Sequence, residues 1–368
     1  MNSYKINKER LIKTFTDLVR IPSPSWGEHR VIDYIAARLE KSGAHCKKIK
    51  CEDSFNLYVS VKGNRIGKPV LFSAHTDTVN PCFNVTPSVT KTRISSAGDT
   101  ILGGDNKAAI AMFIEAVETL KETGQSYPDF ELLLTCAEEV GLMGIKNFDL
   151  TGLKAEYAFV FDSDGDIGRI ITAAPYHYKL KMTVTGRAAH AGMEPEKGIN
   201  AINSLASIIC ALPSGRIDEE TTVNVGTIEG GSATNIVAPS AECHLEVRSI
   251  SKQKATTLIK EIRNTAKTTA ASSGARVKTE SVIEYPGYRI RDNDHIVSAV
   301  RSAMKSITVN PAIAVSGGGS DTNIFNRSGI KAVNLSCGMR NMHSSSEYVL
   351  IKDMVNGARL TLALLDHM

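Results

Sequence analysis

The sequence predicts an α/β protein with a mixed sheet covered by helices on both faces, plus an inserted domain of the ferredoxin-like order βαββαβ. Three observations lead to this fold class. The chain has 368 residues, more than one typical domain holds. Apolar strands alternate with helices in its first half. From about residue 178 this alternation ends, and two strands follow each other between two helices.

The first part of the chain alternates helical patterns with short apolar runs. The segment 1–21 is amphipathic and predicts a helix, as do 28–42, which stops at a glycine, and 107–120, which is rich in apolar residues. Short apolar runs between turn residues predict strands. These runs lie at 56–63, 69–77, 129–139 and 155–162.

The second part predicts a separate domain set into the first. Its expected elements, in chain order, are a strand, a helix, two strands, a helix and a strand, at 178–190, 200–212, 221–231, 241–250, 252–270 and 275–285. This is the ferredoxin-like order. The later segment 312–349 carries a further candidate metal ligand and must return to the first sheet. We therefore predict a discontinuous domain, 1–177 and 290–368, with an inserted domain at 178–289.

Composition and charge exclude several classes of protein. The chain is 42% hydrophobic and 22% charged, as is ordinary for a globular protein, and its net charge of +4 demands no nucleic acid. The basic helix predicted at 252–270 has no aromatic residues between its charges, so it is read as a solvated face. We expect no nucleic-acid partner.

No segment suggests a membrane or an exported protein. No apolar run approaches the roughly 20 residues of a membrane helix, and the charged N-terminal segment leaves no room for a signal-peptide core. The seven cysteines are scattered without a Cys-x-x-Cys pair, which argues against a disulfide framework and a thiolate zinc site. We expect a cytoplasmic protein with no membrane association.

Five short clusters of metal-ligand chemistry follow one another in the chain, each where an apolar strand gives way to a loop. Zinc and similar divalent ions accept imidazole and carboxylate ligands. In open α/β sheets, ligands bind beyond the carboxyl ends of the strands. The clusters are His75-Thr76-Asp77, Gly103-Gly104-Asp105, Glu138-Glu139, Asp162-Ser163-Asp164 and Met342-His343-Ser344.

The spacing within the clusters indicates what each residue could do. Asp77 follows His75 by two residues on an extended segment, so it points to the same side and could accept the second imidazole N–H. Asp105 at a helix start could bridge two metals, cap the helix, or do both. The adjacent Glu138 and Glu139 diverge in direction, so one can bind a metal while the other holds a water. Each feature alone is common on protein surfaces; five in order at strand ends indicate a site.

In this order the motifs resemble those of the co-catalytic dizinc aminoacylase/carboxypeptidase superfamily of metallopeptidases, which includes peptidase T, carboxypeptidase G and succinyl-diaminopimelate desuccinylase. The runs 104–109, 138–141 and 164–168 are most similar to peptidase T relatives. The resemblance covers essentially the whole chain. It implies a zinc-exopeptidase-like catalytic domain, an inserted lid that also dimerises, and two zinc ions per subunit, with cobalt or manganese possible instead.

The resemblance also implies roles for single residues. By position, His75 and Asp162 would bind one zinc ion, Glu139 and His343 the other, and Asp105 would bridge the two. Asp77 would orient His75, and Glu138 would be the general base. The usual Asp-Gly after the fourth strand is here Asp162-Ser163-Asp164-Gly165-Asp166, and Asp162 is chosen because it ends the apolar strand.

In the inserted domain, the resemblance implies substrate-binding residues. His190 matches a histidine that reaches the partner subunit's site to polarise the scissile carbonyl. Asn235 and Arg248 match a substrate-binding pair, and an arginine can grip a carboxylate through two N–H donors. Outside the inserted domain, the glycines of the run 316–321, Gly318 among them, could present backbone N–H groups to a substrate carboxylate. A phosphate loop is the alternative, but the Lys-Ser/Thr that a Walker motif requires is missing.

These readings predict a cytoplasmic zinc exopeptidase resembling peptidase T. It would remove a residue from a short peptide, as an aminotripeptidase does, and would form a homodimer through the lid. One alternative is an amidohydrolase that deacylates N-acyl amino acids with the same chemistry. Another is a non-catalytic peptide-binding protein, although binding alone would not need Glu138 as a base.

Overall fold

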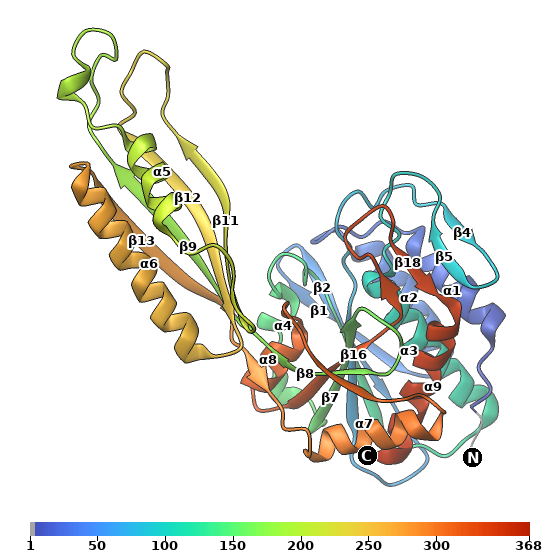
Figure 1. Cartoon of the computed structure of the whole chain (residues 1–368). Helices are drawn as coiled ribbons and strands as arrows, with labels where there is room; N and C mark the ends of the chain where they lie inside the picture. Colours follow the sequence, from blue (N-terminus) through green and yellow to red (C-terminus); the bar gives the residue numbers. More distant parts are fainter. Residues whose placement is uncertain (1–3) are drawn as a thin grey trace. The chain divides into compact units, whose positions relative to one another are not determined.

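The computed structural model describes residues 4–368, which form two compact units (Figure 1). The first unit contains the described residues through Ala173, together with Ile290–Val315 and Ser320–Met368. The second contains Ala174–Arg289 and the short segment Ser316–Gly319. The predicted domain limits place Ser316–Gly319 in the first domain instead. None of the described helices is both long enough and apolar enough to cross a membrane.

The first unit is built on a mixed sheet, which confirms the predicted fold class. Its strands run in the order β1-β2-β6-β3-β7-β16-β8, and β15 also pairs with β8. The central pairs β3·β6, β3·β7 and β7·β16 are parallel, whereas β1·β2 and β2·β6 are antiparallel. The strands are β1 (His45–Cys51), β2 (Ser54–Val61), β3 (Val70–His75), β6 (Phe130–Thr135), β7 (Tyr157–Ser163), β8 (Arg169–Ala174), β15 (Ala312–Val315) and β16 (Lys331–Ser336).

Helices cover both faces of this sheet. Every residue of β3 and of β6 is buried, as expected of strands with helices on either side. Helix α3 packs on β3 and β7, while α8 packs on β7 and β16. The helices of this unit are α1 (Lys8–Val19), α2 (His29–Lys41), α3 (Gly104–Thr123), α4 (Met143–Lys146), η1 (Leu150–Gly152), α7 (His295–Ser306), α8 (Asp321–Arg327) and α9 (Ile351–His367).

The first helix is shorter than predicted. A helix was expected over 1–21, but α1 begins only after Asn7, whose side chain accepts a hydrogen bond from the backbone N–H of Arg10. Such a cap satisfies a free N–H of the first turn and so sets where the helix starts. Residues 1–3 of that prediction lie outside the described residues.

A small second sheet in the first unit was not predicted. Its strands run in the order β17-β18-β5-β4, are two to four residues long, and carry little apolar alternation. It joins segments far apart in the sequence and frames the loop that carries His343. The strands are β4 (Pro87–Val89), β5 (Arg93–Ser96), β17 (Met339–Arg340) and β18 (Tyr348–Leu350).

Aromatic rings fill the centre of the first unit. Phe72 of β3 is fully buried, and its ring centroid lies 5.7 Å from that of Phe113, 5.9 Å from that of Phe130 and 5.8 Å from that of Phe159. These rings join α3 to the strands that end at the candidate site. Edge-to-face and tilted pairs at such distances add to the free energy of burial.

Replacing Phe72 by Ala should therefore destabilise the first unit strongly. Loss of a buried phenyl ring that leaves a cavity costs about 3–5 kcal/mol. Urea denaturation would measure the change against Phe83→Ala, because Phe83 is 53% exposed and should cost little. Equal midpoints for the two variants would contradict this description of the core.

The second unit has the predicted ferredoxin-like arrangement with one extra strand. Its sheet runs β10-β11-β12-β9-β13, and α5 and α6 pack against one face (Figure 1). The additional strand, β10, lies at the edge. The elements are β9 (Tyr176–Thr185), η2 (Pro195–Lys197), α5 (Ala201–Ala211), β10 (Gly215–Asp218), β11 (Thr221–Gly230), β12 (Ser240–Ser249), α6 (Lys252–Ser272), β13 (Arg276–Tyr285) and β14 (Tyr288–Arg289).

The first strand of this unit ends earlier than predicted. A strand was expected over 178–190, but β9 ends at Thr185. At the next residue, Gly186, a Cβ would lie 2.0 Å from the carbonyl oxygen of Ile199. Only glycine fits there, and the chain turns away from the sheet. His190 therefore lies beyond the strand, where it forms an isolated bridge with Ile236.

Candidate metal centre

The parallel strands of the first unit bring the predicted metal ligands to one edge of the sheet. In the register, His75 at the end of β3 is level with Thr135 at the end of β6, and Ser73 is level with Val160 of β7. The loop after β6 carries Glu138 and Glu139, and Asp162 lies near the end of β7. These groups meet because the carboxyl ends of parallel strands share an edge.

His75 stands at the centre of a first group of ligands. Its Nε2 lies 2.9 Å from Asp105 Oδ1 and 3.4 Å from Asp162 Oδ1. Its Nδ1 lies 3.0 Å from the backbone oxygen of Asp77 and 3.3 Å from Asp77 Oδ1. With Nδ1 donating its proton to Asp77, Nε2 is the nitrogen that can bind a metal beside Asp105 and Asp162.

His343 stands at the centre of a second group. Its Nε2 lies 3.0 Å from Glu139 Oε1 and 3.3 Å from Asp105 Oδ2. The two oxygens of Asp105 therefore face different histidines, one in each group. This is the arrangement in which one carboxylate can bridge two metal ions.

The donor atoms fit divalent metal ions in type and spacing. Two ligands about 2.1 Å from a tetrahedral ion lie roughly 3.4 Å apart, and the nitrogen–oxygen distances within the two groups are 2.9–3.4 Å. Ligand atoms of His75, Asp105 and Glu139 all lie within 4.8 Å of one another. Imidazole and carboxylate ligands suit zinc, cobalt and manganese.

The structure also distinguishes Asp162, near the end of β7, from Asp164, which follows the strand. Asp162 Oδ1 faces His75 and accepts a hydrogen bond from Asn106 Nδ2 at 3.0 Å. Asp164 Oδ1 instead accepts one from Arg169 Nη1 at 2.6 Å. Asp162 therefore lies in the ligand cluster, whereas Asp164 is engaged in an ion pair beside it.

Crowded charges shift the pKa values of the cluster. Burial, with the charges of Asp162 and Glu139, raises the pKa of Glu138 well above its usual value. Burial also raises the pKa of Asp162 to about 7. The hydrogen bonds of His343 to Asp105 and Glu139 raise the pKa of this histidine to about 10. Bound cations would relieve the repulsion between these carboxylates.

The backbone at the cluster adopts conformations that L-residues rarely take. Ala137, just before Glu138, has a φ of 48°, and His343 has a φ of 59°. Left-handed conformations of residues other than glycine cost free energy and gather at functional sites. Ala137 directly precedes the candidate base Glu138, and His343 is itself a candidate ligand.

Asp77 links the two sides of the cluster. Its carboxylate accepts hydrogen bonds from the backbone N–H groups of Glu138 at 3.0 Å and of Glu139 at 3.1 Å. The Ser25 hydroxyl donates a third at 2.7 Å. Asp77 therefore positions the Glu138-Glu139 loop as well as His75. Neither the contact with this loop nor the role of Ser25 could be predicted from the sequence.

Glu347 is a second supporting residue that sequence reasoning missed. This buried carboxylate accepts hydrogen bonds from the backbone N–H of Gly103 at 2.8 Å and of Asp105 at 2.9 Å. It thereby holds the segment from which the shared aspartate projects. Its only signal in the sequence is an acidic residue four positions after His343.

Glu347→Gln should weaken metal binding, because an amide group cannot accept both N–H bonds. Loss of such a supporting contact typically lowers metal affinity about 10–100-fold. Competition with a chromophoric chelator would measure the affinity. Glu156→Gln is the matched control, since Glu156 is exposed and pairs with Lys68. Equal affinities in the two variants would show that Glu347 does not support the cluster.

Two of the predicted substrate-binding residues lie together in the second unit. His190 Nδ1 accepts hydrogen bonds from the backbone N–H groups of Gly192 at 3.2 Å and of Met193 at 3.1 Å. Its proton is therefore on Nε2, which makes the exposed ring edge a donor. The backbone oxygen of Asn235 accepts a hydrogen bond from Ala191, which holds Asn235 beside His190.

The other two lie at the segment Ser316–Gly319. Arg248 Nη1 is 3.5 Å from the carbonyl oxygen of Gly317, and its Nε is 3.0 Å from Glu246 Oε1. The N–H of Gly318 donates to Ser316 Oγ at 3.0 Å, so in this structure it already has a partner within the loop.

Comparison with known proteins finds similarity over the whole chain. The family model of the M20 peptidase dimerisation domain matches residues 177–273, and that of peptidase family M28 matches residues 56–187. The uncharacterized protein YqjE of Bacillus subtilis is 35% identical over 98% of this chain and 99% of its own length. Peptidase T of Fusobacterium nucleatum is 28% identical over 74% of this chain, and the match spans 66% of its length.

Solved structures are similar over the same extent. Aminopeptidase PepT from Bacillus cereus matches with a TM-score of 0.91 and 34% identity, covering 98% of this chain and 99% of its own. A tripeptidase from Staphylococcus aureus matches with a TM-score of 0.93 and 31% identity, covering 98% of each chain.

Proposed function

Because the chain belongs to the peptidase T-like M20 metallopeptidases, we propose that it is a zinc-dependent aminopeptidase that removes the N-terminal residue from tripeptides and other short peptides. The observation that carries this proposal is the shared carboxylate of Asp105, whose two oxygens face His75 and His343. Membership of a peptidase family sets aside the alternative of a non-catalytic binding protein.

Two zinc ions per subunit would occupy the two ligand groups, with cobalt or manganese as other ions that the same ligands accept. His75 and Asp162 would hold one ion, Glu139 and His343 the other, and Asp105 both. When bound, such ions polarise the scissile carbonyl and acidify a water molecule.

The chain's own residues would carry the proton and fix the geometry. Glu138 would take the proton of the attacking water and pass it to the leaving amine. Asp77 would keep His75 in the tautomer that leaves Nε2 for the metal, and would hold the backbone of Glu138 in place through its N–H.

Residues of the second unit would bind the peptide. His190 would donate its Nε2–H to the oxygen that becomes negative in the transition state, a role for which its tautomer is suited. Asn235 would bind the substrate beside it, and Arg248 would hold the carboxylate of the peptide. Gly318 would contribute its backbone N–H once released from Ser316.

We further propose a cytoplasmic homodimer formed through the second unit, with 178–289 acting as lid and dimerisation domain. The match of residues 177–273 to a peptidase dimerisation domain supports the dimer.

Removal and return of metal tests the proposed reaction. Dialysis against a chelator should abolish release of the N-terminal residue from a tripeptide, and added zinc, cobalt or manganese should restore it. Full activity in metal-free protein would reject the metal-dependent mechanism.

A subunit-mixing experiment tests the cross-subunit role of His190. His190→Ala and Glu138→Gln subunits should each be inactive alone, and mixing them should restore activity, because each heterodimer regains one site with both residues intact. Mixing His190→Ala with a His190→Ala, Glu138→Gln double variant is the control, since it restores no site. Heterodimers that form yet stay inactive would show that His190 does not act across the interface.

A further inference from the structure

Arg248 belongs to a row of side chains on the face of the second unit's sheet that α5 and α6 leave uncovered. In the register, Arg248 of β12 is level with His177 of β9, and His177 is level with Tyr285 of β13. Directly paired residues of antiparallel strands project to the same face. Alternate residues such as Val247 project to the other face, into the core beneath the helices.

Glu246 occupies one edge of the Arg248 guanidinium. Arg248 Nε donates to Glu246 Oε1 at 3.0 Å, and Arg248 Nη2 donates to Glu246 Oε2 at 3.1 Å. The two residues are two positions apart on β12 and therefore share a face. The pair is bidentate, which fixes the plane of the guanidinium as well as its position.

The opposite end of the guanidinium also has neighbours that position it. Arg248 Nη1 lies 3.4 Å from the Tyr285 hydroxyl and 3.5 Å from the carbonyl oxygen of Gly317. A Cβ at Gly319 would lie 2.3 Å from the Tyr285 ring, so the glycine segment packs tightly on this tyrosine. A guanidinium has five N–H donors. Glu246 takes Nε and one N–H of Nη2. The two contacts of Nη1 are long for hydrogen bonds, so a second carboxylate can replace them at the edge between Nη1 and Nη2.

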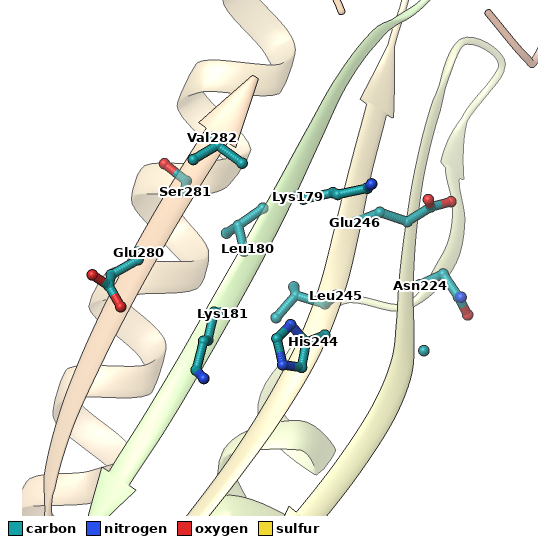
Figure 2. Close-up of a pocket in the computed structure, with 11 residues that line it drawn as sticks. Lys179, Leu180, Lys181, Asn224, His244, Leu245, Glu246, Glu280, Ser281 and Val282 are labelled. Atoms are coloured by element: carbon teal, nitrogen blue, oxygen red, sulfur yellow. The ribbon is translucent and has the colours of Figure 1, made fainter. Parts of the chain in front are cut away.

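His177 lies against Glu246 in turn. Its Nε2 lies 2.9 Å from Glu246 Oε2, and its ring is 4% exposed and 5.1 Å from the Tyr285 ring. The contacts of His177 and then of Arg248 lower the pKa of Glu246 to about 2, so the carboxylate is ionised at ordinary pH. Figure 2 shows Glu246 on β12 close to Lys179 of β9, at a hollow of about 480 Å³ on this sheet.

We propose that Glu246 is a positioning residue, in contact with His177, and that Glu246 aims the Nη1–Nη2 edge of Arg248 at the C-terminal carboxylate of the peptide. This inference rests on the proposed substrate role of Arg248. It assigns selection for peptides with a free C-terminus to a three-residue relay, His177, Glu246 and Arg248. The reaction itself does not depend on this relay, so its loss should raise KM and leave kcat nearly unchanged.

The test compares one tripeptide with its C-terminal amide, using the zinc-loaded full-length protein. Discrimination is the ratio of kcat/KM for the acid to kcat/KM for the amide. Glu246→Ala should lower this ratio by about 10–100-fold, because a small displacement of a binding group can cost that much. The change should lie in KM for the acid, while both constants for the amide stay near wild type. His177→Phe should change the ratio in the same direction but less.

Controls separate positioning from folding. The Glu246 side chain is 31% exposed, and partly exposed ion pairs contribute little to stability, so thermal unfolding should change little. Glu242→Ala is the matched control on the same strand and face, where Glu242 pairs with Lys181 at 2.9 Å; its ratio should equal that of wild type. Glu246→Asp, which keeps a shorter carboxylate, should recover part of the discrimination.

Two results would overturn the inference, and only the second would also reject the proposed role of Arg248. If Arg248→Ala abolishes discrimination while Glu246→Ala and Glu246→Asp retain it in full, Glu246 does not position Arg248, and the proposed role of Arg248 stands. If Arg248→Ala itself retains discrimination, Arg248 does not bind the carboxylate, and its proposed role fails together with the inference.

Discussion

Asp105→Ala should cost the protein its metal and its activity together, and to a greater extent than any other single ligand substitution. Among the described residues, only Asp105 contacts both histidines, through Oδ1 to His75 and Oδ2 to His343. Without it, each ligand group keeps one histidine and one other carboxylate. Metal contributes several kcal/mol to the transition state, so turnover should fall about a thousandfold or more.

Metal analysis after dialysis would measure this effect. Asp105→Ala should retain fewer than two ions per chain, and Asp162→Ala should lose the ion nearest His75. Asp164→Ala is the matched control, because Asp164 pairs with Arg169 outside the cluster. If Asp105→Ala keeps two ions, the shared-carboxylate assignment fails; if Asp164→Ala loses metal while Asp162→Ala keeps it, the wrong aspartate was assigned.

Glu138→Gln should separate the base from the ligands. Glutamine preserves the shape of the side chain but cannot accept the proton of the attacking water. Turnover should fall by about 100-fold or more, while both metal ions stay bound, because the lost group is not one of the proposed ligands.

Steady-state kinetics and metal content measured on the same sample decide this prediction. Glu139→Gln provides the comparison, since it should lose metal as well as turnover. Near-normal turnover by Glu138→Gln with full metal occupancy would remove Glu138 from the role of base.

The sequence predicted the parts of the fold whose burial shows in the local pattern. Strands β3, β6 and β7 are short apolar runs between turn residues, as central strands covered on both faces must be. Strand β1 was missed because it lies at the edge of the sheet, and its sequence HCKKIKC is mostly exposed. The short strands β4 and β5 pair with each other, as do β17 and β18, but the sheet they form depends on the pairing of β5 with β18, which are distant in the chain, and no local pattern reveals it.

The same distinction applies to the candidate site, where residues near strand ends could be predicted and residues held by distant contacts could not. Residues at strand ends, such as His75 and Glu139, could be predicted because a single strand end positions each of them. Glu347 could not, because its contacts with Gly103 and Asp105 span more than 240 positions. Glu246 was within reach, since a residue two positions before Arg248 on a strand shares its face. The sequence alone does not distinguish this ion-paired carboxylate from a solvated one on a strand.

Product analysis on matched peptides tests the central claim most directly. One tripeptide would be offered to the zinc-loaded protein with a free N-terminus and with an acetylated N-terminus, alongside the corresponding N-acetyl amino acid. An aminopeptidase should release the N-terminal residue from the free tripeptide and leave both acetylated compounds intact. Deacetylation of the N-acetyl amino acid with no cleavage of the free tripeptide would contradict the proposed function and identify an amidohydrolase instead.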